Sequence, residues 1–173
     1  MTSRLVAAIV AAVSLLSACS SDGGAMATAA APRMAPGPTL LAQVREAGKL
    51  GKELDVQPLR DPQVEDLRLA ASSAEARSDW AAAAEALAQA AKITPDDPEL
   101  LQWQAEIALA AQDFARAQQL ATQSWQRGAQ LGGLCRRNWT TIRFAAESRG
   151  DSAAATQAQQ HAATCAVAPP NRF

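Results

Sequence analysis

The residues that could carry chemistry in this chain are few and far apart. Its three cysteines are Cys19, Cys135 and Cys165, and its one histidine, His161, stands among glutamines. A thiol can be acylated, oxidised or bound to a metal, but one histidine with cysteines so spaced does not make a usual zinc site. No motif of a serine hydrolase, a phosphate-binding loop or a zinc protease occurs. The sequence therefore predicts no enzyme, no metal and no cofactor, with His161 as a solvated surface residue.

Cys19 closes a short N-terminal leader. Arg4 supplies a positive charge, an apolar run extends from Leu5 to Leu16, and Ser17-Ala18 places small residues before the cysteine. The run is shorter than the roughly 20 apolar residues of a membrane-spanning helix. The segment resembles the signal peptide and lipobox of bacterial lipoproteins. This resemblance implies that residues 1–18 are removed and Cys19 is acylated. It also implies sorting to the outer membrane, facing the periplasm, because serine rather than aspartate follows.

Cys135 and Cys165 remain as an even pair in a compartment that oxidises thiols. A helix rising from Cys135 to residue 150 and one descending from residue 151 to Cys165 climb nearly equal heights, about 22 and 21 Å. We therefore expect both sulfurs at one end of a helical hairpin, joined as a disulfide. The alternative is a pair of reduced, buried thiols.

Composition limits the fold class and the kind of partner. The chain has 173 residues, with 16 Lys and Arg against 17 Asp and Glu. This balance, without a basic stripe, argues against a nucleic-acid partner. Alanine, the best helix former, dominates, and no alternating β-branched window predicts a strand. The predicted class is all-α, with one small domain.

The chain divides into four predicted segments. They are a signal peptide over 1–18, a lipidated N-terminus with flexible tether and short helix over 19–60, a helical domain over 61–168, and a tail over 169–173. The tether is predicted because residues 20–38 are small and interrupted by Pro and Gly, without periodicity.

A short helix is expected where the tether ends, with Thr39 as its N-cap. Leu40, Leu41 and Val44 share one of its faces. That face could dock against the first hairpin or act as an independent binding segment, and the sequence leaves both open.

Six longer helices follow, and their short connections make neighbours antiparallel. Asp61-Pro62 and Asp97-Pro98 each supply a cap followed by proline at the first helical position. The predicted ranges are 62–77, 80–93, 98–111, 114–128, 134–149 and 152–166.

A repeat relates the hairpins that these helices form. Ser78-Asp79-Trp80 matches Gln112-Asp113-Phe114 at an offset of 34 residues, and Ala83 matches Ala117. Gly150-Asp151 marks a third, more divergent copy. The pattern resembles the tetratricopeptide repeat. It implies a short solenoid of about three antiparallel helical hairpins, and a generic alanine-rich bundle is the alternative.

In such an array the first helices of the hairpins line a concave groove. Here that groove would be acidic over the first two repeats and basic over the third. The glutamates along the helices are interpreted as solvated charges, and the turn aromatics Trp80 and Phe114 as packing residues, as is Trp139. The predicted partner contacts are Arg137, Thr140, Arg143, Phe144, Glu106 and Gln102.

Small size, a lipid anchor and a last hairpin with cysteines resemble the layout of tetratricopeptide lipoproteins that activate class A penicillin-binding proteins. The resemblance implies a non-catalytic envelope lipoprotein that binds a peptidoglycan synthase and regulates peptidoglycan synthesis. A pilotin-like assembly factor for a pilus or secretion complex is the alternative. A small-ligand or peptidoglycan binder is a third class.

Overall fold

The computed structural model describes residues 34–50 and 59–166, and every regular element in these ranges is an α-helix. The all-α prediction is confirmed. The predicted leader, Cys19, most of the tether and the C-terminal tail lie outside the described residues. The helices are α1 (Gly37–Gly48), α2 (Pro62–Ala76), α3 (Trp80–Ile93), α4 (Pro98–Ala110), α5 (Phe114–Arg127), α6 (Gly132–Ser148) and α7 (Ser152–Thr164).

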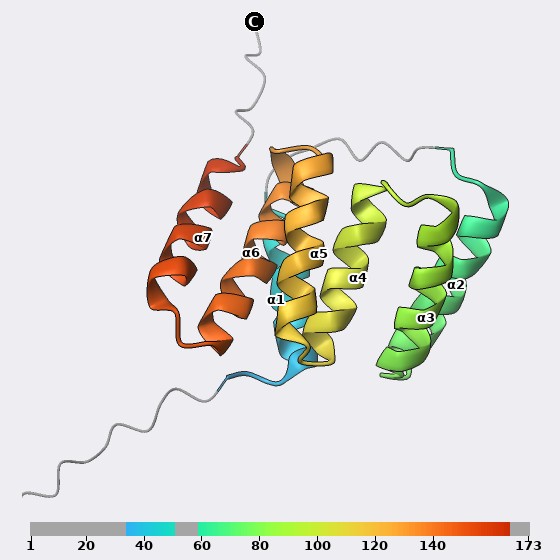
Figure 1. Ribbon diagram of the computed structural model, residues 1–173, viewed down its shortest axis with the longest axis horizontal. Coiled ribbons are helices and arrows are strands. Elements are labelled where there is room, and N and C mark those ends of the chain that lie inside the picture. Colours follow the sequence, from blue (N-terminus) through green and yellow to red (C-terminus); the bar gives the residue numbers. More distant parts are fainter. Residues whose placement is uncertain (1–33, 51–58, 167–173) are drawn as a thin grey trace, which may run out of the picture. The chain divides into compact units, whose positions relative to one another are not determined.

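Three antiparallel hairpins, α2–α3, α4–α5 and α6–α7, follow one another along the domain (Figure 1). Neighbouring hairpins pack through α3 against α4 and through α5 against α6. This is the arrangement expected of a short, tetratricopeptide-like array. The helix α1 departs from chain order, because it packs against α4 and α6. Of the two alternatives that the sequence left open, docking of the apolar face on the first hairpin is not what the structure shows, since this face lies on α4 and α6.

Aspartates fix where most helices begin. A side-chain oxygen accepts a hydrogen bond from backbone N–H groups of the first turn in five helices, with Asp61, Asp79, Asp97, Asp113 and Asp151 as the caps. Each such bond satisfies a donor that has no partner within the helix. These five helices start where the sequence predicts.

Two helices lack such a cap, and both begin earlier than predicted. The helix α1 starts at Gly37 after Pro36, with no side-chain cap bond, so the prediction of Thr39 as N-cap is wrong. The proline ring presets a backbone angle that suits a helix start. The helix α6 starts at Gly132 after Leu131, two residues before the predicted position.

The turn inside each hairpin has the same geometry. Ser78, Gln112 and Gly150 all adopt the left-handed conformation, with φ of 58°, 61° and 71°. The next residue then donates its N–H to a carbonyl five residues earlier, as in a Schellman motif. The pairs are Asp79–Ala74 (2.9 Å), Asp113–Ala108 (2.8 Å) and Asp151–Ala146 (3.1 Å). The divergent third hairpin therefore repeats the turn of the first two.

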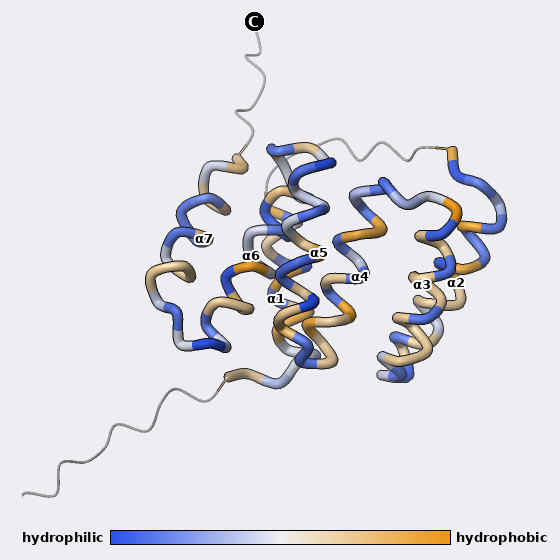
Figure 2. Tube along the Cα trace, viewed as in Figure 1, coloured by the Kyte–Doolittle hydropathy of each residue, from blue (hydrophilic) through white to orange (hydrophobic). Residues whose placement is uncertain are grey.

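Small residues allow the helices to approach closely. Ala83 and Ala117, at matching positions of α3 and α5, are both fully buried. Trp80 and Phe114 pack against the hydrophobic clusters beside them, as predicted. In Figure 2 the most hydrophobic positions are more frequent on α4, in the middle of the array, than on α7 at its end. Within the described ranges, no helix is long and apolar enough to cross a membrane.

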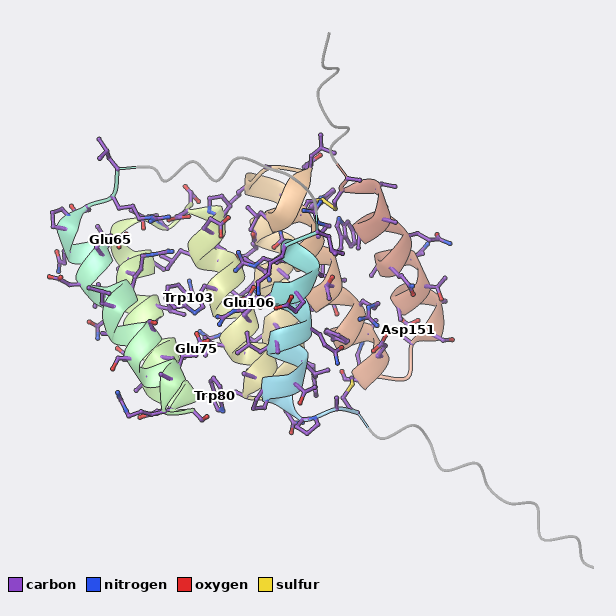
Figure 3. All side chains as sticks on the ribbon, turned by 180° about the vertical axis from the view of Figure 1, so that it is seen from behind. Glu65, Glu75, Trp80, Trp103, Glu106 and Asp151 are labelled. Carbon is purple, nitrogen blue, oxygen red and sulfur yellow. A yellow bond between two sulfur atoms is a disulfide. The ribbon has the colours of Figure 1, made fainter. Side chains whose placement is uncertain are left out.

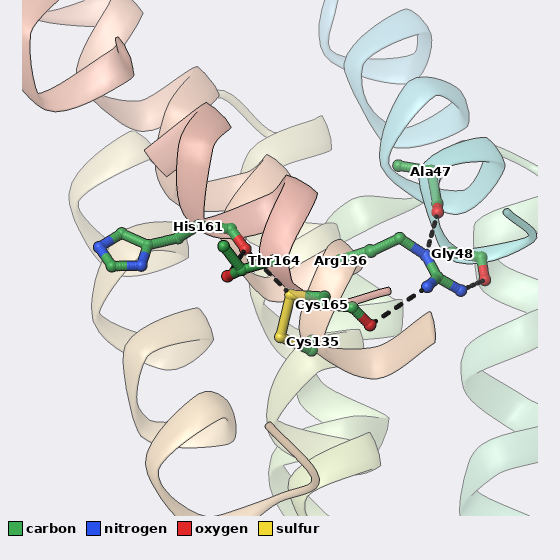
Figure 4. Close-up of a disulfide and its surroundings, with 7 residues drawn as sticks. All are labelled: Ala47, Gly48, Cys135, Arg136, His161, Thr164 and Cys165. Atoms are coloured by element: carbon green, nitrogen blue, oxygen red, sulfur yellow. Dashed lines mark hydrogen bonds between the residues drawn. A yellow bond between two sulfur atoms is a disulfide. The ribbon is translucent and has the colours of Figure 1, made fainter. Parts of the chain in front are cut away.

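A disulfide joins Cys135 in the first turn of α6 to Cys165 at the end of α7, with the two Cα atoms 5.7 Å apart (Figure 4). The pairing is the one that the sequence predicts. Only Ala155 and Ala158 of α7 are buried, so this helix has little apolar area to hold it on α6. The covalent link compensates for that deficit at the end of the array.

We expect neither Cys135 nor Cys165 to react with a thiol reagent when the purified full chain is denatured without reductant. Reduction should lower the free energy of unfolding by about 3–4 kcal/mol, the value for closing a loop of this length, since 30 residues separate the cysteines. Peptide mapping of the labelled chain and urea unfolding measure the two effects. Labelling of both cysteines in the non-reduced protein would contradict the assignment.

Candidate functional site

The groove formed by α2, α4 and α6 is occupied by α1. Leu40, Leu41 and Val44 of α1 are buried, with no more than 6% of each exposed. Leu40 and Val44 join a cluster with Leu109 of α4 and Phe144 of α6. The apolar face of α1 thus covers the positions at which a tetratricopeptide array is expected to contact a ligand.

Two glycines let α1 lie this close. A Cβ atom on Gly37 would be 2.0 Å from the carbonyl oxygen of Ala110, a distance that no side chain tolerates. A Cβ atom on Gly48 would be 2.7 Å from a side-chain carbon of Arg137. Gly37 is therefore required for this position of α1, whereas a larger residue at Gly48 would have to displace the Arg137 side chain.

Glu106 is the centre of a polar network beneath α1. Its side chain is fully buried and accepts hydrogen bonds from three others. Arg45 Nε of α1 donates at 3.0 Å, Arg137 Nε of α6 at 2.7 Å and Gln102 Nε2 at 3.1 Å. One carboxylate thus links α1, α4 and α6, and the interpretation of Glu106 as a solvated charge is wrong.

A second carboxylate extends the network to the first hairpin. Both terminal nitrogens of Arg45 donate to Glu75 of α2, and Trp103 Nε1 donates to the same carboxylate at 3.0 Å. On the other side, the Nη1 atom of Arg137 donates to Glu99 at 3.0 Å. Figure 3 looks onto this face, with Glu75, Trp103 and Glu106 between α2 and α1. Side chains from four helices therefore meet in this groove.

The two arginines are held as cations by these carboxylates. Burial alone would lower the pKa of Arg45, but its hydrogen bond to Glu75 and the charges of Glu106 and Glu75 raise it above the ordinary value. Burial likewise acts to lower the pKa of Arg137, and Glu106 and Glu99 outweigh it. Opposite charges at hydrogen-bond distance favour the charged forms of both partners.

The structure brings the six predicted partner contacts onto two adjacent helices but does not leave all of them accessible. Gln102 and Glu106 are fully buried, and Phe144 is 3% exposed. Arg137 is committed to Glu106 and Glu99. While α1 is docked, the prediction of direct partner contact is wrong for these four residues.

Thr140 and Arg143 line an open groove between α1 and α7, which we call the α1–α7 groove. Its volume is about 640 Å³. The residues around it are Gln43, Ala47, Leu50, Arg136, Thr140, Arg143, Gln159, Ala162, Ala163 and Ala166. Arg143 lies over the ring of Phe144 and pairs with Glu147 on its own helix. Of these two predicted contacts, the Arg143 side chain is 26% exposed and within reach of a partner, whereas Thr140 lies at the floor of the groove and is 7% exposed.

Arg136 closes one end of the α1–α7 groove (Figure 4). Its guanidinium donates to the carbonyl oxygens of Ala47 and Gly48 at the end of α1, at 3.0 and 3.3 Å. It also donates to the carbonyl oxygen of Cys165 at 3.4 Å. One side chain of α6 thus holds the C-terminal ends of α1 and α7 together.

His161 is exposed, as predicted, but it has a specific neighbour. Its ring stacks on Trp139 with centroids 4.2 Å apart, and Trp139 meets Trp125 edge to face at 5.2 Å. Trp139 also packs against the core cluster beneath it, which confirms its interpretation as a packing residue. The three rings belong to α5, α6 and α7, and they help hold the last hairpin to the one before it.

Arg45 is the functional residue that sequence reasoning missed. It directly follows Val44, and the apolar face of this helix was recognised. Its partners Glu75 and Glu106, however, lie 30 and 61 positions away along the chain. Only knowledge of where α1 docks would have paired them.

Replacing Glu106 with glutamine should lower the free energy of unfolding by about 3 kcal/mol, because it removes the buried negative charge that two partly buried arginines share. Glu85→Gln is the matched control, since Glu85 is exposed on α3, and it should change stability by less than about 0.5 kcal/mol. Urea unfolding of both purified variants provides the measurement. Equal stabilities would show that the network does not hold the groove together.

Comparison with known proteins supports the assignment of this domain. No model of a protein family matches the sequence, and no curated protein matches it. Among solved structures, the chain is similar to the globular C-terminal domain of P. aeruginosa LpoP, with 32% identity and a TM-score of 0.56. The match covers 61% of this chain and 99% of that chain. The helical domain of this chain therefore belongs to the same family as the globular C-terminal domain of LpoP.

Proposed function

We propose that this chain is an envelope lipoprotein whose helical domain binds and activates a class A penicillin-binding protein. The observation that carries the proposal is the similarity to the LpoP domain over almost the whole length of that domain. The leader ending at Cys19 adds a lipid anchor, outer-membrane location and periplasmic orientation to the proposal. Activation requires no catalytic group in this domain, only a surface that favours the active form of the synthase.

The surface that we propose for the synthase is the side of α6 that carries Thr140 and Arg143. Arginine is favoured at the energetic centres of protein interfaces. In the α1–α7 groove the arginine has alanines, a leucine and two glutamines around it, and no acidic residue lines the groove. This chemistry suits a partner segment that combines a carboxylate with small apolar side chains.

Replacing Cys19 with alanine should release the chain from the membrane, since acyl chains supply about 0.8 kcal/mol per buried methylene. We expect the variant in the soluble fraction of lysed cells, without incorporation of a labelled fatty acid. Ser20→Ala, next to the modified position, should behave as the original chain. Equal fatty-acid labelling of the Cys19→Ala chain would rule out this residue as the anchor.

Replacing Arg143 with glutamate should weaken the affinity for a purified class A synthase at least fivefold, because it puts a negative charge where a carboxylate is expected. Full chains in detergent are compared by binding titration and by the rate of glycan polymerisation. Arg77→Glu is the matched control, since Arg77 is exposed at the end of α2, far along the chain from α6.

Circular dichroism shows whether the Arg143→Glu chain is folded. Unchanged affinity in a folded variant would remove Arg143 from the interface. Failure of the original chain to bind or stimulate the synthase would overturn the proposed function. Recovery of a secretin after crosslinking in intact envelopes would favour the pilotin-like alternative.

A further inference from the structure

The helix α1 lies where the groove was expected to receive a partner. It packs on Phe144 and bonds to Glu106, two of the six predicted contacts, and its Gly48 lies against Arg137. The chain itself thus supplies a helical occupant of its groove. The contacts of α1 therefore indicate the kind of helix that fits this groove.

Two features of α1 match two features of the groove. Its aliphatic side chains, Leu40 and Val44, fit beside Leu109 and Phe144. Its cation, Arg45, then meets the carboxylates of the network beneath α1. Without α1, the groove would present an apolar strip bordered by acidic residues. An amphipathic helix with an arginine beside its apolar stripe is the complementary ligand.

Several features of α1 would allow another helix to replace it in the groove. The helix has 12 residues and, like α6, no side-chain cap, and a helix of this length is marginal without tertiary contacts. The side chain of Arg45 is 37% exposed, so water reaches the rim of its ion pairs. By contrast, most residues of α4 are buried on all sides. Four of the 12 residues of α1 are buried, against ten of the 13 of α4, and elements with fewer buried residues open locally more readily in native proteins.

We propose that α1 is an internal ligand of the groove, and that an amphipathic, arginine-bearing helix of the partner takes its place. This inference rests on the proposed function for the identity of the partner. Displacement of α1 exposes Phe144 and removes Arg45 from the Glu75 and Glu106 carboxylates, which keep their bonds to Trp103, Arg137 and Gln102. The partner helix binds only to molecules in which α1 has left the groove. Its apparent affinity is therefore the intrinsic affinity multiplied by the fraction of molecules with an empty groove.

The first test needs no partner. In the full chain with Arg45→Glu, repulsion from Glu75 and Glu106 should release α1, and its amides should exchange hydrogen at least tenfold faster than those of α4. Lys49→Glu is the matched control, because it makes the same charge change at an exposed position of the same segment, where Lys49 pairs with Glu46. Amides of α1 that stay as protected as those of α4 in the Arg45→Glu chain overturn the inference.

The second test uses a fluorescent synthetic peptide with the sequence from Pro36 to Lys49. It should bind the Arg45→Glu chain at least tenfold more tightly than the original chain, whose groove is filled. A peptide carrying glutamate in place of Arg45 should not bind. Equal binding of both peptides, or binding of neither to the Arg45→Glu chain, overturns the inference.

The third test brings in the purified class A synthase. Release of α1 should tighten its binding at least tenfold in the Arg45→Glu chain and leave the Lys49→Glu chain unchanged. Weaker or unchanged binding by the Arg45→Glu chain overturns the inference and leaves the proposed function in place. Binding by none of the chains overturns the proposed function, while the exchange and peptide measurements still decide the role of α1.

Discussion

The arrangement of this domain depends on one buried carboxylate. Glu106 has no exposed surface, and it accepts hydrogen bonds from Arg45 and Arg137, which come from helices on either side of it. An isolated carboxylate in that position would be very costly, and two guanidinium groups remove the cost only when α1 and α6 are both in place. The charge of Glu106 therefore favours the arrangement in which α1 and α6 both pack beside α4. Hydrophobic contacts alone would tolerate several positions of α1 along the groove, whereas this ionic arrangement allows one.

The repeated part of the fold could be predicted because its signals are local. An aspartate such as Asp113 caps a helix only a few residues away, and the left-handed turn at Gln112 is confined to one residue. The 34-residue spacing between Asp79 and Asp113, with a third copy at Gly150-Asp151, then predicts an array of helical hairpins. The disulfide could also be predicted, because the chain from Cys135 to the turn at Gly150 is about as long as the chain from the turn back to Cys165.

The site was less accessible to prediction, because it depends on contacts between distant segments. Two residues of α4 and α6, Gln102 and Phe144, were assigned to a partner, but Gln102 is fully buried and Phe144 packs against α1. Nothing near Leu40 and Val44 in the sequence says which helix they meet. The close approach of Gly37 to Ala110 is also invisible before the fold is known. Local patterns thus predict which faces of the helices are apolar, and only the fold shows which helix packs on which face.

The disulfide and the seat of α1 are parts of one arrangement. Carbonyl groups at helix C-termini carry partial negative charge and lack helical partners. Arg136 satisfies such groups on α1 and on the residue that ends α7, Cys165. Because Cys165 is bonded to Cys135, the neighbour of Arg136 in the chain, the covalent link fixes the guanidinium relative to both helix ends. Reduction would therefore loosen the hold on the carbonyl groups of Ala47 and Gly48 together with α7, while the Arg45–Glu106 pair at the start of the same turn would still hold. Glu106 and the disulfide thus control different parts of the same docked helix.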